Sequence, residues 1–172
     1  MLHRLFILGC MALLLAGCGI DTPEGQDPVK VKDPVPAFSV TLQDGSVYNS
    51  TDKASWPAVI VFFHTSCADC QKTLPVIQRV YDLYRPKINF VCIARAEEAD
   101  AIQAFWLQNH LTLPWSAQKD RSVYSLFAAS RIPRVYIVGW TGKVRAIYAD
   151  NPCPSFEELC TQLDSLFSKD SE

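Results

Sequence analysis

The feature that most restricts the fold of this chain is the tetrapeptide Cys-Ala-Asp-Cys at residues 67–70, which joins two segments of different periodicity. Residues 58–63, before it, are a continuous apolar run rich in valine, isoleucine and phenylalanine, as expected of a strand covered on both faces. Residues 68–84 have apolar side chains at helical spacing. A buried strand that leads directly into a helix is typical of an α/β protein.

This position gives the two cysteines a specific chemistry. At the start of a helix, unpaired N–H groups and the helix dipole stabilise a thiolate, which favours Cys67 as a nucleophile. Cys70 lies one helical turn further on, where its thiol can resolve a mixed disulfide formed at Cys67. Zinc sites use the same C-x-x-C spacing, but the strand-to-helix setting favours redox chemistry.

The other patterns predict an α/β fold in which a central mixed sheet is flanked by helices. An Asp-Gly pair at residues 44–45 predicts an N-terminal β-hairpin. Alternation and helical spacing further predict strands over 88–94, 113–117, 135–138 and 143–148, and helices over 97–110, 122–129 and 155–167, the last opened by a capping box. No internal repeat or second domain is evident.

Two prolines add detail to this prediction. Pro75 lies inside the helical pattern, where it should kink the helix. Pro133 directly precedes a predicted strand, which is an unfavourable place for a residue without an N–H group. A cis Ile132–Pro133 bond would explain that placement by turning the loop toward the cysteines.

Together these residues resemble the thioredoxin superfamily, with a strand, a C-x-x-C helix, an Ile-cis-Pro segment, a hairpin and a last helix. The early hairpin and the extra helix and strand between residues 94 and 121 are similar both to the TlpA-like thiol–disulfide oxidoreductases and to the peroxiredoxins. The resemblance covers residues 35–167 and implies a thioredoxin-like domain over residues 35–172. It also implies that Cys67 is the nucleophile, Cys70 the resolving thiol and Pro133 the cis-proline that shapes the substrate groove.

The chain departs from the family pattern at several positions. Ser66 replaces the usual aromatic residue before the first cysteine, and Val61 replaces the buried acid of thioredoxin, so the proton acceptor stays unassigned. Peroxiredoxins need a proline and a threonine or serine where this chain has Ile60 and His64, which disfavours a peroxidase.

Four charged or titratable residues are candidate accessory groups. The negative charge of Asp69 disfavours a thiolate at Cys67 and therefore a strongly oxidising couple. His64, Arg131 or Arg134 would offset that charge if they approach the cysteines. The alternatives are two solvated arginines and a histidine that packs where the strand ends.

The N-terminal residues indicate export. A basic start and an apolar run too short to span a bilayer predict a signal peptide over residues 1–17. Its end, Leu-Ala-Gly-Cys, resembles the bacterial lipobox, which implies lipidation of Cys18; a plain signal peptide with a chance cysteine is the alternative. Residues 18–34 are rich in proline and polar residues, and they predict a flexible tether from the lipidated cysteine. We therefore expect a lipid anchor in a bacterial cell envelope, facing the periplasm or the exterior, with the choice of inner or outer membrane open.

Three cysteines remain outside these motifs. Cys92 lies in a buried strand pattern and Cys160 on the apolar stripe of the last helix, so both are expected in the core. Cys153 lies between two prolines, where we expect an exposed loop and either a second redox role or a structural or incidental thiol. A disulfide with Cys160 would require Cα atoms within about 7 Å, which the helix spacing does not guarantee.

Composition excludes several other functions. The chain has 172 residues, 49% hydrophobic and 20% charged, which is typical of a globular domain and not of a disordered or polytopic membrane protein. Its formal net charge is −2, so there is no electrostatic reason to expect a nucleic-acid partner.

The sequence thus predicts a membrane-anchored thiol–disulfide oxidoreductase that reduces or isomerises disulfides of exported proteins. Family analogy implies an upstream membrane thiol electron donor, and no cofactor or resident metal is predicted. The main alternative is a thioredoxin-fold metal-binding module or metallochaperone, with Cys67, Cys70 and His64 as ligands. A non-catalytic binding module is a third reading, which the intact cysteines and Pro133 disfavour.

Overall fold

The computed structural model describes residues 27–168. The described chain has the elements β1 (Ser39–Thr41), β2 (Val47–Asn49), the short 3₁₀ helix η1 (Lys53–Ser55), β3 (Ala58–Phe63), α1 (Ala68–Tyr84), β4 (Asn89–Ala94), α2 (Ala99–Gln108), β5 (Trp115–Ser116), α3 (Ser122–Ser125), β6 (Arg134–Val138), β7 (Val144–Tyr148) and α4 (Phe156–Ser165). Their order agrees with the predicted alternation of strands and helices.

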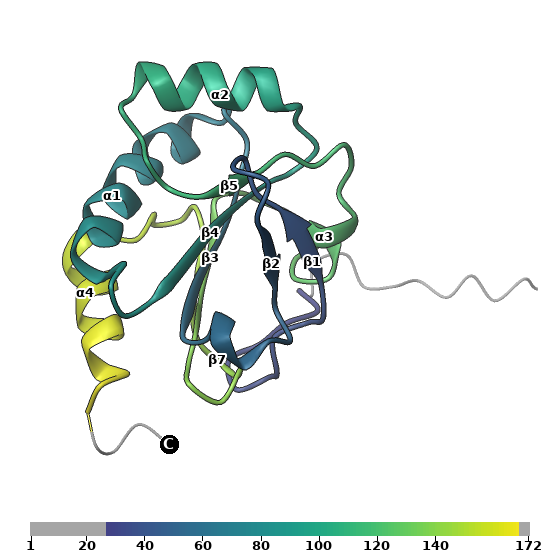
Figure 1. Cartoon of the computed structure of the whole chain (residues 1–172). Coiled ribbons are helices and arrows are strands. Elements are labelled where there is room, and N and C mark those ends of the chain that lie inside the picture. The colour runs from purple at the N-terminus through teal and green to yellow at the C-terminus, as the bar shows by residue number, and fades with distance from the viewer. Residues whose placement is uncertain (1–26, 169–172) are drawn as a thin grey trace, which may run out of the picture.

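Five of the strands form one mixed sheet in the order β5-β4-β3-β6-β7. Strands β3, β4 and β5 run parallel, whereas β6 is antiparallel to both β3 and β7. Strands β1 and β2 form a separate antiparallel hairpin, which turns at Gly45 with a positive φ of 83°. This arrangement, drawn in Figure 1, confirms the predicted thioredoxin-like fold.

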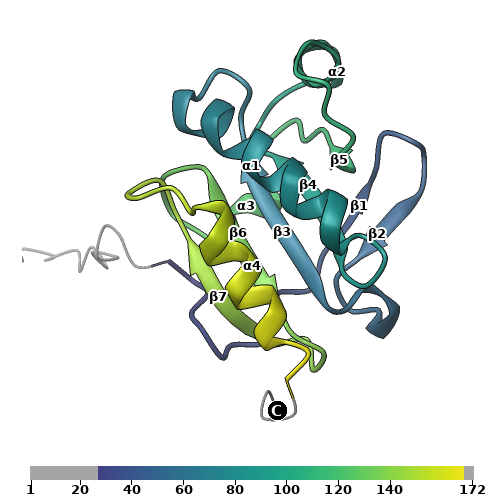
Figure 2. The ribbon, with the colours of Figure 1, turned by 90° about the vertical axis from the view of Figure 1, so that its left-hand side faces the viewer.

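The central strand β3 is buried at all six positions because both faces of the sheet are covered. Helices α1 and α4 lie side by side on one face (Figure 2). On the other face, Phe62 of β3 packs against Phe127, with ring centroids 4.9 Å apart, and Phe127 contacts Phe38 at the start of the hairpin at 5.5 Å. An apolar run without polar positions is therefore the sequence that this strand requires.

Three predicted helices are shorter than the sequence pattern indicated, and α4, predicted over residues 155–167, differs little from its prediction. Helix α2 ends at Gln108 and begins only at Ala99, so Glu97 is not part of its first turn but is a buried residue that precedes it. Helix α3 covers four residues of the predicted eight. The capping box predicted at Ser155 is present, with both reciprocal hydrogen bonds to Glu158.

The folded part of the chain begins earlier than predicted. Residues 27–34 were expected to belong to a flexible tether, with the fold starting at Val35. Instead, the backbone N–H of Lys32 donates to the carbonyl of Val144 at 2.8 Å, and the N–H of Val35 donates to Gly142 at 2.9 Å. Val29 is only 5% exposed. The segment therefore packs beside the edge strand β7 (Figure 2). Its proline-rich composition had suggested a flexible tether and gave no indication of this pairing.

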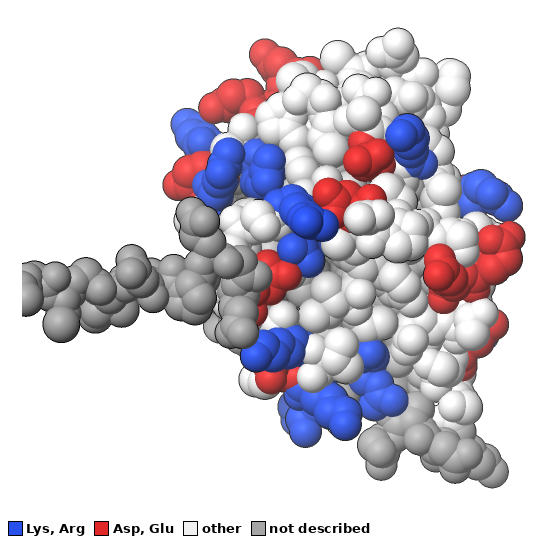
Figure 3. Space-filling view, turned by 180° about the vertical axis from the view of Figure 1, so that it is seen from behind, with Lys and Arg blue, Asp and Glu red and all other residues white. Residues whose placement is uncertain are grey.

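The surface carries charges of both signs. On the face shown in Figure 3, lysine and arginine side chains occur together with aspartate and glutamate, separated by uncharged surface. This mixed distribution agrees with the small formal net charge of −2.

Candidate functional site

Cys67 lies at the junction of β3 and α1, as the sequence predicted. Its backbone is extended, with φ −81° and ψ 119°, and it is the N-cap residue of α1, although its side chain makes no capping hydrogen bond. The N–H of Gln71 donates to the Cys67 carbonyl at 3.0 Å and so begins the helix. The thiol of Cys67 is partly accessible and sits at the positive end of the helix dipole. The sulfur is therefore reachable from solvent and lies beside the unpaired N–H groups of the first helical turn.

Cys70 differs from Cys67 in its depth in the structure. It lies one turn into α1 and is fully buried, with 0% exposure. Burial raises the pKa of the Cys70 thiol well above its ordinary value, and the backbone at His64 opposes this only in part. Both cysteines are free thiols in this structure. An accessible first thiol and a buried, protonated second thiol are what sequential thiol–disulfide exchange requires.

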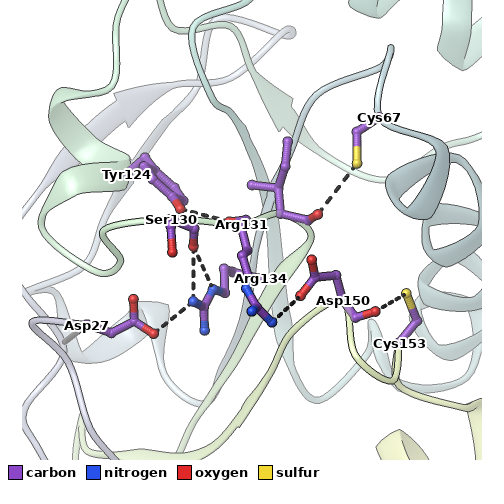
Figure 4. A network of polar contacts seen from close by, with 9 residues as sticks. Asp27, Cys67, Tyr124, Ser130, Arg131, Arg134, Asp150 and Cys153 are labelled. Carbon is purple, nitrogen blue, oxygen red and sulfur yellow. Dashed lines mark hydrogen bonds and ion pairs between the residues drawn. The ribbon is translucent and has the colours of Figure 1, made fainter. Parts of the chain in front are cut away.

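The loop before β6 contributes the opposite side of the site. The Ile132–Pro133 bond is cis, as the position of Pro133 predicted. Because Arg134 pairs with Phe62 in the antiparallel β3–β6 register, this loop lies beside the end of β3 and therefore beside Cys67. The Cys67 thiol points at the Ile132 carbonyl oxygen at 3.5 Å (Figure 4). The structure thus brings Cys67, Cys70 and the cis-proline loop together.

Asp69 is placed on the outer side of the first turn of α1. Its carboxylate contacts the ammonium group of Lys72 at 3.2 Å, and the two side chains are 42% and 74% exposed. The sequence did not identify Lys72 as its partner. An exposed pair of this kind reduces the effect of the Asp69 charge on the neighbouring thiol.

His64 is held within the loop that leads to Cys67. Its Nδ1 lies 2.9 Å from the Ser66 hydroxyl and accepts from the Ser66 N–H at 3.2 Å. The same Nδ1 lies 3.5 Å from a carboxylate oxygen of Glu97. His64 therefore orders the loop next to Cys67, and this ring nitrogen is already engaged.

Glu97 is a site residue that the sequence analysis missed. Its side chain is only 5% exposed, and one carboxylate oxygen accepts from the Thr65 N–H at 2.9 Å while the other accepts from the Thr65 hydroxyl. A buried carboxylate needs such partners. Glu97 thus fastens the residues between β3 and Cys67. In the sequence, Glu97 looked like an acidic residue in the first turn of a helix. Nothing in that pattern indicated its contact with Thr65, which depends on the pairing of β3 with β4.

The two candidate arginines form ion pairs with aspartates. Arg131 is exposed, and its guanidinium lies 3.6 Å from Asp150. Arg134 is buried: it donates to the Ser130 carbonyl and pairs with Asp27 at 2.8 Å (Figure 4). The expectation that Arg134 is either solvated or near the thiolate was therefore wrong, because the N-terminal segment supplies its partner.

The remaining cysteines have separate environments. Cys92 is completely buried in β4, and burial raises the pKa of its thiol. Cys160 is partly buried in α4 rather than fully in the core. Cys153 lies in the loop after β7, partly accessible, with its sulfur 3.8 Å from the Asp150 carbonyl (Figure 4). All three are free thiols, so Cys153 and Cys160 are not paired in this structure.

No metal cluster is formed by the residues that the structure describes, since no three His, Cys, Asp or Glu side chains there come together as a ligand set. The predicted signal peptide and Cys18 lie outside residues 27–168. Within that range, none of the helices has the length and apolar character needed to cross a membrane.

Comparisons with known proteins agree with this geometry. The AhpC/TSA family matches residues 31–147. The thiol-disulfide oxidoreductase ResA of Bacillus anthracis is 25% identical over 148 residues, which covers 83% of this chain and 86% of ResA.

Solved structures show the same fold. A thiol:disulfide interchange protein of the thioredoxin family from Chlorobium tepidum superposes with a TM-score of 0.69 at 18% identity, covering 81% of this chain and 99% of that one. A thio-disulfide isomerase from Thermus thermophilus gives 0.65 at 24% identity, covering 82% and 99%.

Proposed function

The chain belongs to the AhpC/TSA family and is a thiol–disulfide oxidoreductase, and on this premise we propose that Cys67 and Cys70 are its redox couple and that disulfides of exported proteins are its substrates. One observation carries the proposal. Cys67 combines an accessible sulfur at the start of α1 with a contact to the carbonyl that precedes cis-Pro133, while Cys70 is buried behind it.

The first half-reaction takes place at Cys67. Its thiolate attacks one sulfur of a client disulfide, an S–S bond forms between Cys67 and the client, and the client's other sulfur leaves as a thiolate that takes up a proton. The helix N-terminus stabilises the attacking charge. The peptide groups beside Pro133 are placed to hold the client backbone, since the Ile132 carbonyl already faces the Cys67 sulfur.

The second half-reaction involves Cys70. Its thiol must lose a proton and attack the Cys67 sulfur, which breaks the mixed disulfide and releases the second client thiolate. The client gains two electrons and the Cys67–Cys70 pair becomes a disulfide. Because burial raises the pKa of Cys70, this thiol stays protonated until the mixed disulfide forms. Turnover as a reductase then requires a thiol donor that reduces the pair again, and we propose a membrane protein for that role.

The N-terminal sequence supports a place at the cell envelope. The apolar run before Cys18 and the lipobox-like Leu-Ala-Gly-Cys support export and lipidation. We propose that Cys18 anchors the protein to a bacterial membrane. Replacing Cys18 by serine should move the protein from the membrane fraction to the soluble fraction and abolish labelling by a radioactive fatty acid; unchanged labelling would refute the anchor.

The redox assignment is tested by reduction of insulin with dithiothreitol, using the full chain in detergent. The wild-type protein should accelerate the reaction, and Cys67→Ser should lower the rate to that of dithiothreitol alone. Cys92→Ala is the matched control, because it removes a thiol that is fully buried away from the site. Full activity of Cys67→Ser would refute the assignment.

Clients and donor are identified by trapping. In cells, Cys70→Ser leaves the first half-reaction intact but removes the thiol that resolves it, so mixed disulfides should accumulate and be identified by mass spectrometry. The double variant Cys67→Ser with Cys70→Ser is the control and should trap nothing. If Cys70→Ser traps no exported protein, the proposed substrate class is wrong.

The same protein distinguishes the metal-binding alternative. Reduced wild-type chain that holds zinc or copper tightly at one ion per chain, and has no reductase activity, would favour a metallochaperone. His64 in that case would need its second ring nitrogen as a ligand, because Nδ1 faces Ser66 and Glu97.

A further inference from the structure

A pocket with a basic lining, the basic pocket, lies where the N-terminal segment packs beside β7 (Figure 2). It has a volume of about 310 Å³, and the described residues that line it are Val31, Lys32, Lys143, Val144 and Arg145. The N–H of Lys32 donates to the Val144 carbonyl at 2.8 Å. Pro34 forms an antiparallel bridge with Lys143. The pairing of two distant segments therefore brings these side chains together.

The lining of the basic pocket is positively charged. No aspartate or glutamate is among the lining residues that the structure describes. Lys32 and Lys143 are exposed, and neither forms an ion pair with a carboxylate of residues 27–168. The carboxylate of Asp33, next to Lys32, accepts from the backbone N–H of Lys30 at 2.8 Å. Arg145 adds a third cation, so the pocket suits a phosphate group.

Exposed aromatic side chains lie at the same end of the sheet. Trp140 is in the turn between β6 and β7, three residues before Lys143, and it is 52% exposed. Its ring packs against Phe167, which is 42% exposed, with centroids 5.9 Å apart. The ammonium group of Lys87 lies 5.5 Å from the centroid of Phe167. Tryptophan and lysine side chains together are typical of surfaces that rest in the headgroup region of a bilayer.

This end of the sheet is opposite to the redox site. Ala58, the first residue of β3, pairs with Val138, which directly precedes the turn that holds Trp140. Cys67 comes after the other end of β3, and the six residues of that strand span about 20 Å. A molecule that rests on a bilayer with this turn would therefore direct Cys67 away from the lipid.

The N-terminal chain is long enough for that orientation. Asp27, the first described residue, pairs with Arg134 at the start of β6, and Lys32 is five residues further on. Five residues span at most about 17 Å, whereas the eight between Cys18 and Asp27 span up to about 30 Å. An anchor at Cys18 can therefore reach the surface on which Lys32 would rest.

We propose that the basic pocket binds phosphate groups of anionic phospholipids, with Trp140 and Phe167 in the headgroup layer beside it. The inference goes beyond the redox function and builds on the proposed place at the cell envelope. Charge complementarity selects the partner, because an anionic bilayer presents many phosphates to a pocket with several cations. Each lysine or arginine near such a surface strengthens binding about fivefold.

The test is quenching of tryptophan fluorescence when vesicles are titrated into the full chain. The vesicles contain phosphatidylcholine with a nitroxide on its headgroup, with or without one third phosphatidylglycerol. Trp106 and Trp115 are buried and Trp56 is partly buried, so most of the quenched emission should come from Trp140 and disappear in Trp140→Phe. Quenching should be at least about threefold stronger with phosphatidylglycerol, and it should weaken when added salt shortens the Debye length below about 10 Å.

Substitutions in the basic pocket test the contact itself. Lys32→Gln combined with Lys143→Gln should lower the equilibrium constant for the quenched state about 25-fold, which is about fivefold for each lysine. Lys119→Gln combined with Arg121→Gln is the matched control. It removes the same charge from exposed residues in the loop after β5, at the redox end of the sheet, and should change the constant less than about twofold.

Four results would overturn the inference. They are equal quenching by the two kinds of vesicle, an unchanged constant in the double lysine variant, an equal loss in the control variant, and binding of inorganic phosphate without any response to phosphatidylglycerol. The last would indicate a site for a free anion. Failure of insulin reduction or of fatty-acid labelling at Cys18 would instead refute the proposed function, and the comparison of vesicles is independent of both.

Discussion

The cysteines of this protein lie at different depths in the fold, and the accessibility of their thiols differs accordingly. Cys67 lies at the surface end of α1, Cys70 one turn inward, and Cys92 in the centre of the sheet. The C-x-x-C spacing predicts a nucleophile and a resolving thiol for the first two, and these roles stay predictions. The apolar strand pattern predicted the burial of Cys92, which the structure confirms. Spacing could not predict the buried carboxylate of Glu97, because this residue reaches the loop before Cys67 only through the pairing of β4 with β3.

The buried thiols predict how the stability of the reduced protein depends on pH. Burial raises the pKa of Cys70 and of Cys92, so the unfolded chain releases thiol protons at a pH where the folded chain keeps them. The stability is therefore fully present below the ordinary thiol pKa of about 8.5 and falls above it, by up to about 1.4 kcal/mol per pH unit for each thiol.

Urea unfolding of the reduced protein between pH 7 and pH 9.5 measures this loss. Cys92→Ala should show a shallower decline, because one of the two thiols is gone. A free energy of unfolding that does not change over this range would contradict the expected effect of burial.

The hydrogen bond between Thr65 and Glu97 should contribute to both the stability and the activity of the protein. Thr65→Val removes the hydroxyl that donates to the buried carboxylate but keeps the shape of the side chain. A hydrogen bond to a charged group is worth about 1.5–3 kcal/mol, and we expect a loss of stability of that size together with slower insulin reduction. Thr65→Ser keeps the hydroxyl and should restore both. Equal behaviour of the two variants in thermal unfolding and in the assay would show that the contact has no role.

At the scale of elements, periodicity predicted most of what the structure shows. The long helix over residues 68–84, the buried central strand and the capping box of α4 have strong local patterns, and each is present with the predicted bounds or close to them. The short elements α3 and β5 were predicted too long, because two to four residues leave no periodic pattern and depend on the neighbours they contact.

Two turn glycines should differ in how much stability their replacement by alanine costs: Gly45, between β1 and β2, and Gly142, between β6 and β7. Gly45 and Gly142 both have positive φ, of 83° and 72°. A Cβ at Gly45 would meet open space, whereas a Cβ at Gly142 would lie 2.4 Å from the indole of Trp56. Gly45→Ala should cost about 1 kcal/mol from its backbone conformation alone.

Gly142→Ala should cost at least about 2 kcal/mol more, because the Trp56 ring must also move. Chemical unfolding of the two variants measures the difference. Equal losses would mean that Trp56 moves away without cost.

At the scale of the whole molecule, the N-terminal segment is part of the fold and not only a connection to it. Asp27 pairs with the buried Arg134 and also accepts from the N–H of Ala129, so it joins the segment to β6 and to the loop after α3. The sequence did not predict this because neither Asp27 nor Arg134 belongs to a local motif that names its partner.

Asp27→Ala should therefore destabilise the protein by about 2 kcal/mol, since it leaves a buried guanidinium with only the Ser130 carbonyl. Lys72→Ala, which breaks the exposed pair with Asp69, should cost less than about 0.5 kcal/mol. Thermal unfolding of both variants provides the comparison. A loss in Asp27→Ala no larger than in Lys72→Ala would show that the segment contributes little to the fold.

The pairing of the N-terminal segment with β7 also limits how far the redox site can work from a membrane. If Cys18 carries the lipid as proposed, only eight residues separate it from Asp27. Even fully extended, they span about 30 Å, whereas a chain that was free up to Val35 would reach about 60 Å. The redox site would then react only with partners that enter a thin layer of the envelope close to the bilayer.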